Sequence, residues 1–157
     1  DLRWREPRDI SPWHTEIDAT SEKVEGCVAF QSGDIFPSGS EDCLKLNVWS
    51  PKLTTNKLLP VLLWIHGGCY TDGQISTEYN LYNGKNLVEA SGGKVVVVAI
   101  QYRLNIFGFM GSERIRNRTL NGSTGNFGIQ DQRSAMRWVH KHISHFNGDP
   151  QKVFLFG

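Results

Sequence analysis

The residues best suited to chemistry form a short run, 66–69 (His-Gly-Gly-Cys), directly after an apolar stretch that ends at Ile65. Consecutive apolar residues predict a strand that is buried on both faces, as in a parallel sheet covered by helices. Glycines carry no Cβ, so the backbone N–H groups of such a loop can come close to a ligand. Because open α/β sheets bind ligands at the carboxyl ends of their strands, we expect a binding or catalytic loop here.

Three histidines, His140, His142 and His145, lie close together but do not predict a metal site. On a helix only His142 and His145 share a side, and two ligands without a neighbouring Cys or carboxylate are too few for zinc. The glycines at 92–93 and 122–125 match neither a phosphate-binding loop nor a dinucleotide-binding motif. We therefore expect neither a metal nor a cofactor.

Composition excludes several classes of partner. The chain has 157 residues and is 39% hydrophobic, which is enough for one ordinary domain with a core. Its formal net charge is +1 and no long basic run is present, so nothing indicates binding to nucleic acid. The apolar runs are far too short for a membrane span.

Two candidate glycosylation sequons begin at Asn117 and Asn121. Both lie in the polar stretch 111–125, which predicts an exposed loop, and a glycan acceptor needs that exposure. The Asn-x-Ser/Thr pattern also occurs by chance in cytosolic chains. The two sequons nevertheless favour a secreted protein or one in the endomembrane lumen.

The first part of the chain predicts an irregular wrapping segment. Residues 1–26 are rich in charge, Trp and Pro, and we expect short edge strands within them. Cys27 and Cys43 bracket a polar loop. If they are bonded, the closed loop contributes about 3 kcal/mol, whereas in a reducing compartment both would be free thiols. Apolar and polar residues then alternate over 44–49, which predicts a half-exposed antiparallel strand.

The rest of the chain alternates between predicted strands and helices. A wholly apolar run at 95–100 predicts a second buried strand, and 153–156 a third. A short helix is expected at 84–90, and apolar residues at helical spacing predict a long helix over 129–146. This order indicates an α/β fold, in which antiparallel strands lead into a parallel sheet with right-handed crossover helices.

Several blocks together resemble the type-B carboxylesterase and cholinesterase family. They are 40–49 (SEDCLKLNVW), 66–70 (HGGCY), 101–109 (QYRLNIFGF), 125–132 (GNFGIQDQ) and 146–150 (FNGDP). The resemblance implies the amino-terminal part of an α/β-hydrolase fold. It also implies hydrolysis of small carboxylic esters through an acyl-enzyme, with a triad of Ser, Glu or Asp, and His.

The same resemblance makes Gly67, Gly68 and Cys69 an oxyanion loop. The N–H groups of Gly68 and Cys69 would face the developing negative charge, with Gly67 shaping the turn, and losing one such donor typically costs about 2.7 to 4 kcal/mol. Cys69 stands where many active members have glycine, and a passive role for its thiol is favoured over a reactive one. Non-catalytic adhesion relatives, such as neuroligins, also carry a small residue there. A non-catalytic binding domain is therefore the alternative function.

The family also implies several structural contacts. Cys27 and Cys43 match its first disulfide, and Glu41 is expected to bridge to Arg3 across that region. Structural rather than chemical roles are implied for Arg103, Asp131, Trp138 and Asp149. The loop between the two cysteines contains no tryptophan, whereas cholinesterases carry their choline-binding tryptophan there. We therefore do not expect specificity for choline esters.

No catalytic triad is expected within these residues. In the family, the strand matching 153–156 leads into the nucleophile elbow G-x-S-x-G, of which Gly157 would be the first glycine. No serine in the sequence is flanked by glycines at both required positions, and in α/β-hydrolases the acid and the histidine follow the nucleophile. Residues 1–157 are thus expected to form the amino-terminal portion of a single hydrolase domain, inactive alone. The oligomeric state cannot be predicted.

Overall fold

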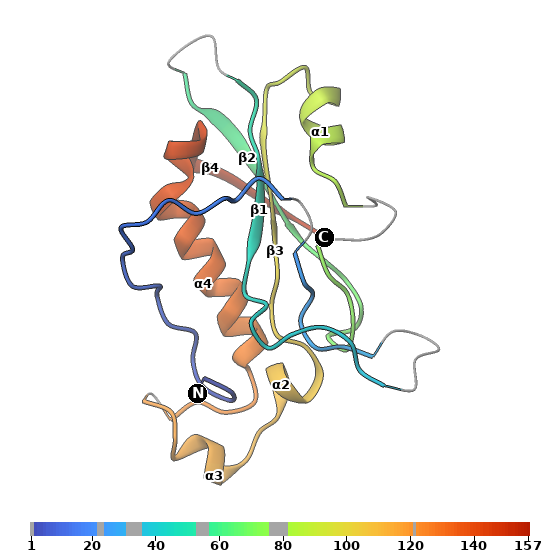
Figure 1. The fold of residues 1–157 in the computed structure, drawn as a ribbon, viewed down its shortest axis with the longest axis vertical. Coiled ribbons are helices and arrows are strands. Elements are labelled where there is room, and N and C mark those ends of the chain that lie inside the picture. Colours follow the sequence, from blue (N-terminus) through green and yellow to red (C-terminus); the bar gives the residue numbers. More distant parts are fainter. Residues whose placement is uncertain (1, 22–23, 31–35, 53–56, 76–81, 121) are drawn as a thin grey trace.

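The computed structural model describes residues 2–21, 24–30, 36–52, 57–75, 82–120 and 122–157 (Figure 1). In this part of the chain, one mixed sheet contains β1 (Leu46–Trp49), β2 (Leu59–Ile65), β3 (Val96–Ile100) and β4 (Gly148–Phe156). The strand order is β1-β3-β2-β4. β1 pairs antiparallel with β3, whereas β2 is parallel to both β3 and β4. The predicted α/β class and the antiparallel lead-in strand are confirmed.

The two central strands differ in burial. Every residue of β3 is buried, as its uninterrupted apolar run predicts. In β2, Val61 and Leu63 are fully buried, whereas Leu62 and Trp64 are only partly covered. The prediction that β2 is buried on both faces is therefore wrong. The face that carries Val61 and Leu63 packs in the core against helical residues, whereas the opposite face is only partly covered. Over the other face Trp64 contacts the ring of Tyr82 at 5.5 Å.

The long helix α4 (Phe127–His142) covers one face of the sheet (Figure 1). Its apolar stripe packs against the buried side chains of β2 and β3, with Val139 completely buried in that core. The single helix predicted over 129–146 is wrong at its end, since the last turn is a separate 3-10 helix, η1 (Ile143–Phe146). Asn147 then takes a left-handed conformation with φ of 67° and ends the helical segment.

The connections contain three further helices among the residues that the structure describes. The short helix predicted at 84–90 is confirmed as α1 (Lys85–Ala90), which packs beside β3. α2 (Asn105–Phe109) and α3 (Glu113–Arg116) follow β3. α3 lies inside the stretch 111–125, which was predicted to be a loop. It forms because the Ser112 hydroxyl caps it, accepting a hydrogen bond from the Ile115 N–H at 3.1 Å.

The amino-terminal segment wraps around the domain without forming strands. No strand occurs among the described residues of 1–26, so the predicted edge strands are wrong. The segment is held by hydrogen bonds from other elements instead. Arg103 donates to the carbonyls of Leu2 and Arg5, and the indole of Trp4 donates to the carbonyl of Ile106. Isolated bridges begin only at Cys27, which pairs with Ser40.

β4 is an edge strand within the described part of the chain. It begins at Gly148, five residues before the predicted start at Val153, because its first half is polar and gives no apolar signal. Pro150 is compatible with this position, since an edge strand does not need every N–H group. Phe154 and Leu155 remain 57% and 54% exposed. The strand thus presents apolar side chains to its surroundings.

Candidate active site

The carboxyl ends of β2, β3 and β4 meet at one edge of the sheet. Ile65, the last residue of β2, is in register with Ile100, the last residue of β3. β4 ends beside them, since a Cβ built on Gly157 would lie 2.6 Å from the Ile65 carbonyl oxygen. The loop that starts at His66 therefore leaves the sheet at the edge where α/β proteins bind their ligands.

This loop turns back on itself within four residues. The carbonyl of Gly68 accepts a hydrogen bond from the N–H of Thr71 at 2.9 Å, which closes a β-turn. Its two central residues, Cys69 and Tyr70, have φ values of 52° and 62°. Two left-handed central residues define a type I′ turn, which normally contains Gly, Asn or Asp.

The turn stores backbone strain. A non-glycine residue in the left-handed region costs roughly 1–2 kcal/mol. Cys69 and Tyr70 both adopt this conformation. Gly68 has a φ of 117°, and a Cβ there would overlap the backbone and the carboxylate of Asp72. By contrast, a Cβ on Gly67 would meet no atom within 4 Å. Strained conformations of this kind cluster at functional sites.

Hydrogen bonds hold three successive carbonyls of the loop. The hydroxyl of Tyr102 donates to the carbonyl of His66 at 2.7 Å, and Nδ1 of His66 lies 2.9 Å from the carbonyl of Gly67. The carbonyl of Gly68 accepts from the N–H and the hydroxyl of Thr71, and from the N–H of the next residue. Among the described residues, the N–H groups of Gly68 and Cys69 have no hydrogen-bond partner.

His66 and Tyr102 form the buried support under the loop. Each side chain is 2% exposed, and the two rings stack with centroids 4.4 Å apart. Burial lowers the pKa of the His66 imidazole, outweighing the opposite effects of the Gly67 carbonyl and the Asp72 carboxylate. Burial, with smaller contributions from Tyr70 and Asp72, raises the pKa of Tyr102 to about 12. Both groups are therefore neutral near pH 7.

A buried ion pair fixes the segment after β3. Arg103 binds Asp131 of α4 in a bidentate arrangement, through Nε at 2.7 Å and an NH2 group at 2.8 Å. The backbone N–H of Arg103 donates to the same carboxylate at 3.1 Å. Burial raises the pKa of Asp131, and the hydrogen bonds and charge of Arg103 oppose that rise. The pair connects elements rather than facing the loop, which agrees with the structural roles expected for both residues.

The two other predicted structural residues also serve the scaffold. Trp138 packs against the core and contacts the rings of His142 and Phe146. Asp149 forms an ion pair with Lys152 at 3.0 Å.

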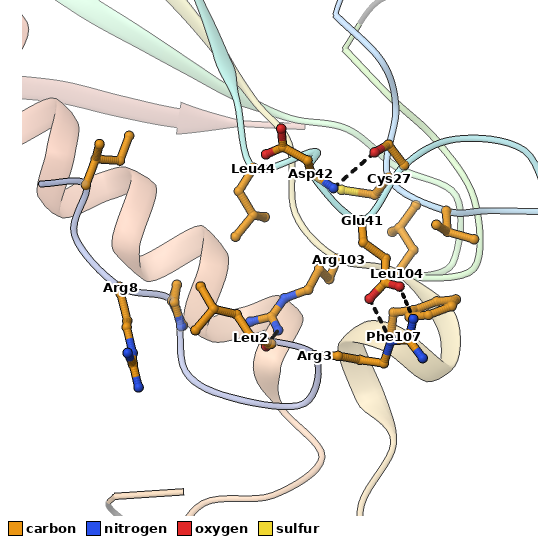
Figure 2. A pocket seen from close by; sticks show the side chains of 14 residues that line it. Leu2, Arg3, Arg8, Cys27, Glu41, Asp42, Leu44, Arg103, Leu104 and Phe107 are labelled. Atoms are coloured by element: carbon orange, nitrogen blue, oxygen red, sulfur yellow. Dashed lines mark hydrogen bonds and ion pairs between the residues drawn. The ribbon is translucent and has the colours of Figure 1, made fainter. Parts of the chain in front are cut away.

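The predicted disulfide is present between Cys27 and Cys43, and Cys69 is a free, exposed thiol. The expected bridge from Arg3 to Glu41 is also confirmed, with Nε of Arg3 at 2.7 Å from the carboxylate. This ion pair and Cys27 line a cavity of about 440 Å³. Figure 2 shows Arg3 and Glu41 pointing toward one another at this cavity. None of the loop residues 66–73 lines it, so this cavity is separate from the candidate active site.

Asn117 is exposed at the end of α3, whereas Asn121 lies outside the described residues. Among the residues that the structure describes, no group of three His, Cys, Asp or Glu side chains could hold a metal ion. In the same part of the chain, no helix is long and apolar enough to cross a membrane.

Sequence reasoning did not single out the residues that hold the loop. Thr71 and Tyr102 both donate to its carbonyls, and Asn105 donates its N–H to the carbonyl of Tyr70 at 2.7 Å. The Asp-Gly pair at 72–73 is a turn signal that could have indicated the reversal. No local signal reveals Tyr102, because its contact joins the ends of two strands that are distant in the sequence.

The parallel strands, the covering helix and the glycine loop at the carboxyl edge define the amino-terminal part of an α/β-hydrolase fold. The match to the carboxylesterase family model covers residues 1–157. This chain therefore belongs to the carboxylesterase family.

The relatives that the chain resembles include esterases whose names indicate different substrates. The chain is 36% identical to fumonisin B1 esterase of Sphingopyxis macrogoltabida, over 100% of this chain and 28% of the relative. It is 38% identical to para-nitrobenzyl esterase of Bacillus subtilis (strain 168), over 99% of this chain and 31% of the relative. It is also 39% identical to acetylcholinesterase-1 of Trittame loki, over 99% of this chain and 28% of the relative.

A solved structure supports the fold. The crystal structure of Aspergillus niger EstA matches with a TM-score of 0.80 and 35% identity, covering 98% of this chain and 28% of that chain. The chain thus spans less than a third of the length of the relatives that it matches.

Proposed function

We propose that the whole protein is a serine carboxylesterase and that these residues form the amino-terminal portion of its single hydrolase domain. The names of the relatives support ester hydrolysis as the activity. One observation in the chain carries the proposal. At the carboxyl edge of the sheet, two adjacent N–H groups, those of Gly68 and Cys69, have no partner among the described residues, while the carbonyls of both peptide units are hydrogen-bonded.

In the proposed mechanism, a serine oxygen attacks the carbonyl carbon of a small ester while a histidine takes the serine proton. The carbonyl oxygen becomes an oxyanion, which the N–H groups of Gly68 and Cys69 stabilise. The histidine then gives its proton to the departing alcohol, leaving an acyl-enzyme that water hydrolyses by the same two steps. Neutral His66 beneath the loop adds no charge of its own to this site.

The proposal places the triad outside these 157 residues. Gly157 would begin the G-x-S-x-G elbow, so the nucleophile would be the second residue after it. The position of Gly157 beside Ile65 would bring that elbow next to the oxyanion loop. The segment by itself is expected to be inactive, because it supplies oxyanion donors without a nucleophile or a base.

We also propose that the protein is secreted or lies in the endomembrane lumen. The disulfide between Cys27 and Cys43 is typical of oxidising compartments, and Asn117 is exposed as a glycan acceptor must be. Treatment of the native protein with an N-glycosidase should increase its electrophoretic mobility. Unchanged mobility, together with intracellular retention, would argue against this location.

The function is tested on the full-length protein with p-nitrophenyl acetate, with and without an organophosphate. We expect hydrolysis that the organophosphate abolishes, with one phosphoryl group bound per active site on the elbow serine. Replacing that serine with alanine should remove activity and leave the melting temperature unchanged.

A protein without the elbow serine, or without hydrolysis above background, would refute the esterase proposal. The alternative, a non-catalytic binding domain, would then account for the left-handed Cys69 at a position where glycine is usual. That alternative predicts binding to a protein partner that is unaffected by organophosphate.

A further inference from the structure

The two proposed donor N–H groups belong to peptide units whose carbonyls are hydrogen-bonded in different ways. The N–H of Gly68 shares a peptide plane with the carbonyl of Gly67, and the N–H of Cys69 shares one with the carbonyl of Gly68. In a trans peptide the N–H and the C=O point in opposite directions. A group that binds one of these carbonyls therefore sets the direction of the corresponding N–H.

The carbonyl of Gly67 depends on a single donor. Nδ1 of His66 lies 2.9 Å from this oxygen, and no other hydrogen bond to it is formed within the described part of the chain. A carbonyl only accepts, so Nδ1 carries the proton and Nε2 is bare. Nε2 is indeed buried without a hydrogen-bond partner among the described residues, as fits a nitrogen that has no proton to donate.

The surroundings fix the imidazole in this pose. Its ring stacks on Tyr102, whose hydroxyl also holds the carbonyl of His66. Gly73 packs so closely that a Cβ there would overlap both Nδ1 of His66 and the carbonyl oxygen of Gly67. Only glycine at 73 allows the loop to close over this hydrogen bond.

The carbonyl of Gly68 has three donors instead of one. The N–H of Thr71, its hydroxyl at 3.0 Å and the N–H of Asp72 at 3.1 Å all reach it. Removing the Thr71 hydroxyl leaves two backbone donors in place. The direction of the Cys69 N–H is therefore much less sensitive to any one side chain than that of the Gly68 N–H.

We propose that His66 is the positioning residue of the oxyanion loop, acting through the Gly67 carbonyl to aim the Gly68 N–H at the substrate oxygen. This inference rests on the proposed esterase function. The hydrogen bond also polarises the Gly67–Gly68 peptide and makes its N–H a stronger donor.

The test compares matched variants of the full-length enzyme. His66→Phe keeps a ring to stack on Tyr102 but removes the donor, whereas His66→Asn retains an amide donor near the place of Nδ1. Thr71→Val removes only the redundant hydroxyl. We measure kcat and KM for p-nitrophenyl acetate, and inhibition by a trifluoromethyl ketone, which forms a tetrahedral oxyanion adduct with the serine.

His66→Phe should lower kcat by about tenfold with little change in KM. The inhibition constant of the trifluoromethyl ketone should rise by a similar factor. His66→Asn should recover most of this loss. Thr71→Val should lose clearly less activity than His66→Phe, because the N–H groups of Thr71 and Asp72 still bind the Gly68 carbonyl. An unchanged kcat in a folded His66→Phe enzyme would overturn the inference. His66→Phe and His66→Asn could instead lose the same amount of activity, through changes in both kcat and KM. That result would overturn the inference in favour of a purely structural role for His66.

A second measurement does not depend on a variant that folds or on activity. Nitrogen chemical shifts of the full-length protein labelled with ¹⁵N-histidine should show His66 neutral and protonated on Nδ1 at pH 7. Protonation on Nε2 would overturn the inference. A wild-type protein that lacks organophosphate-sensitive hydrolysis would refute the proposed function instead, so the two failures are distinguishable.

Discussion

Cys69 illustrates how one side chain can conflict with the conformation that its backbone adopts. It occupies a left-handed position that costs a non-glycine residue roughly 1–2 kcal/mol. We expect Cys69→Gly to stabilise the full-length protein by about 0.5–1 kcal/mol, because relief of this strain exceeds the added flexibility of the unfolded chain. Denaturant unfolding provides the measurement.

Cys69→Ala is the matched control for that substitution. It removes the thiol but keeps the Cβ, so it should retain the strain and unfold like the wild type. If the alanine and glycine variants are equally stable, the turn is not strained at this position. Both variants should keep ester hydrolysis, since each retains the backbone N–H that the proposed mechanism uses.

His66 also predicts a dependence of stability on pH. Its folded pKa lies below the unfolded value of about 6.5. At acidic pH the unfolded chain therefore binds a proton that the folded chain does not, and stability falls as the pH drops below the unfolded pKa. The groups that face the ring are the Gly67 carbonyl, Asp72 and Tyr102, and of these the Gly67 carbonyl and the Asp72 carboxylate partly offset the effect.

Melting temperatures of the wild type and His66→Phe at pH 7.5 and pH 5 measure this contribution. The wild type should lose more stability on acidification than the variant. Equal losses would show that His66 titrates in the folded protein as it does in the unfolded chain.

At the residue level, the loop could be predicted because glycines that follow an apolar run form a local sequence signal. The residues that hold it were not visible. Thr71 acts through a turn that closes only when Cys69 and Tyr70 are left-handed, and nothing in their side chains indicates that conformation. Tyr102 lies in a block that resembles the family, but nothing in the sequence indicates its hydrogen bond to the carbonyl of His66.

Among the elements, the ion pair between Arg103 and Asp131 connects the end of β3 to α4. We expect Arg103→Met to destabilise the full-length protein by about 3–5 kcal/mol, since it leaves a buried carboxylate without its partner. Chemical denaturation measures the loss. Replacing Asp131 with leucine in addition should recover part of it, because the unpaired charge is then gone.

Arg3→Met serves as the control for this prediction. Arg3 also forms an ion pair, with Glu41, but these side chains are 47% and 42% exposed. Water and salt screen such a pair, so the substitution should change stability little. Similar losses in the two variants would show that burial is not what makes the Arg103 pair important.

Apolar patterning predicted the elements wherever burial decides structure. β3 and most of α4 follow their patterns, and the antiparallel β1 follows its alternation. The first half of β4 was missed because its pairing with β2 depends on backbone hydrogen bonds rather than on apolar side chains. α3 was missed because a single turn with a serine cap carries little periodic signal.

For the molecule as a whole, the uncovered edge strand decides how these 157 residues behave alone. β4 exposes Phe154 and Leu155 and leaves backbone groups available for pairing. Expressed by itself, the segment should associate or aggregate in a concentration-dependent way, as sedimentation velocity would reveal. A monomer with one cooperative unfolding transition would contradict this expectation.

The anchoring of the amino-terminal segment has a consequence for the order of events during synthesis. Arg103 donates hydrogen bonds to the carbonyls of Leu2 and Arg5, which lie 101 and 98 residues earlier in the sequence. Asp131, which orients Arg103, lies 28 residues later. Leu2 and Arg5 are thus synthesised well before the residue that holds them. The Cys27–Cys43 loop spans only 16 residues and can close long before them. Nascent chains stalled before residue 131 should carry a closed disulfide, while the segment around Leu2 and Arg5 is still unanchored and open to proteases.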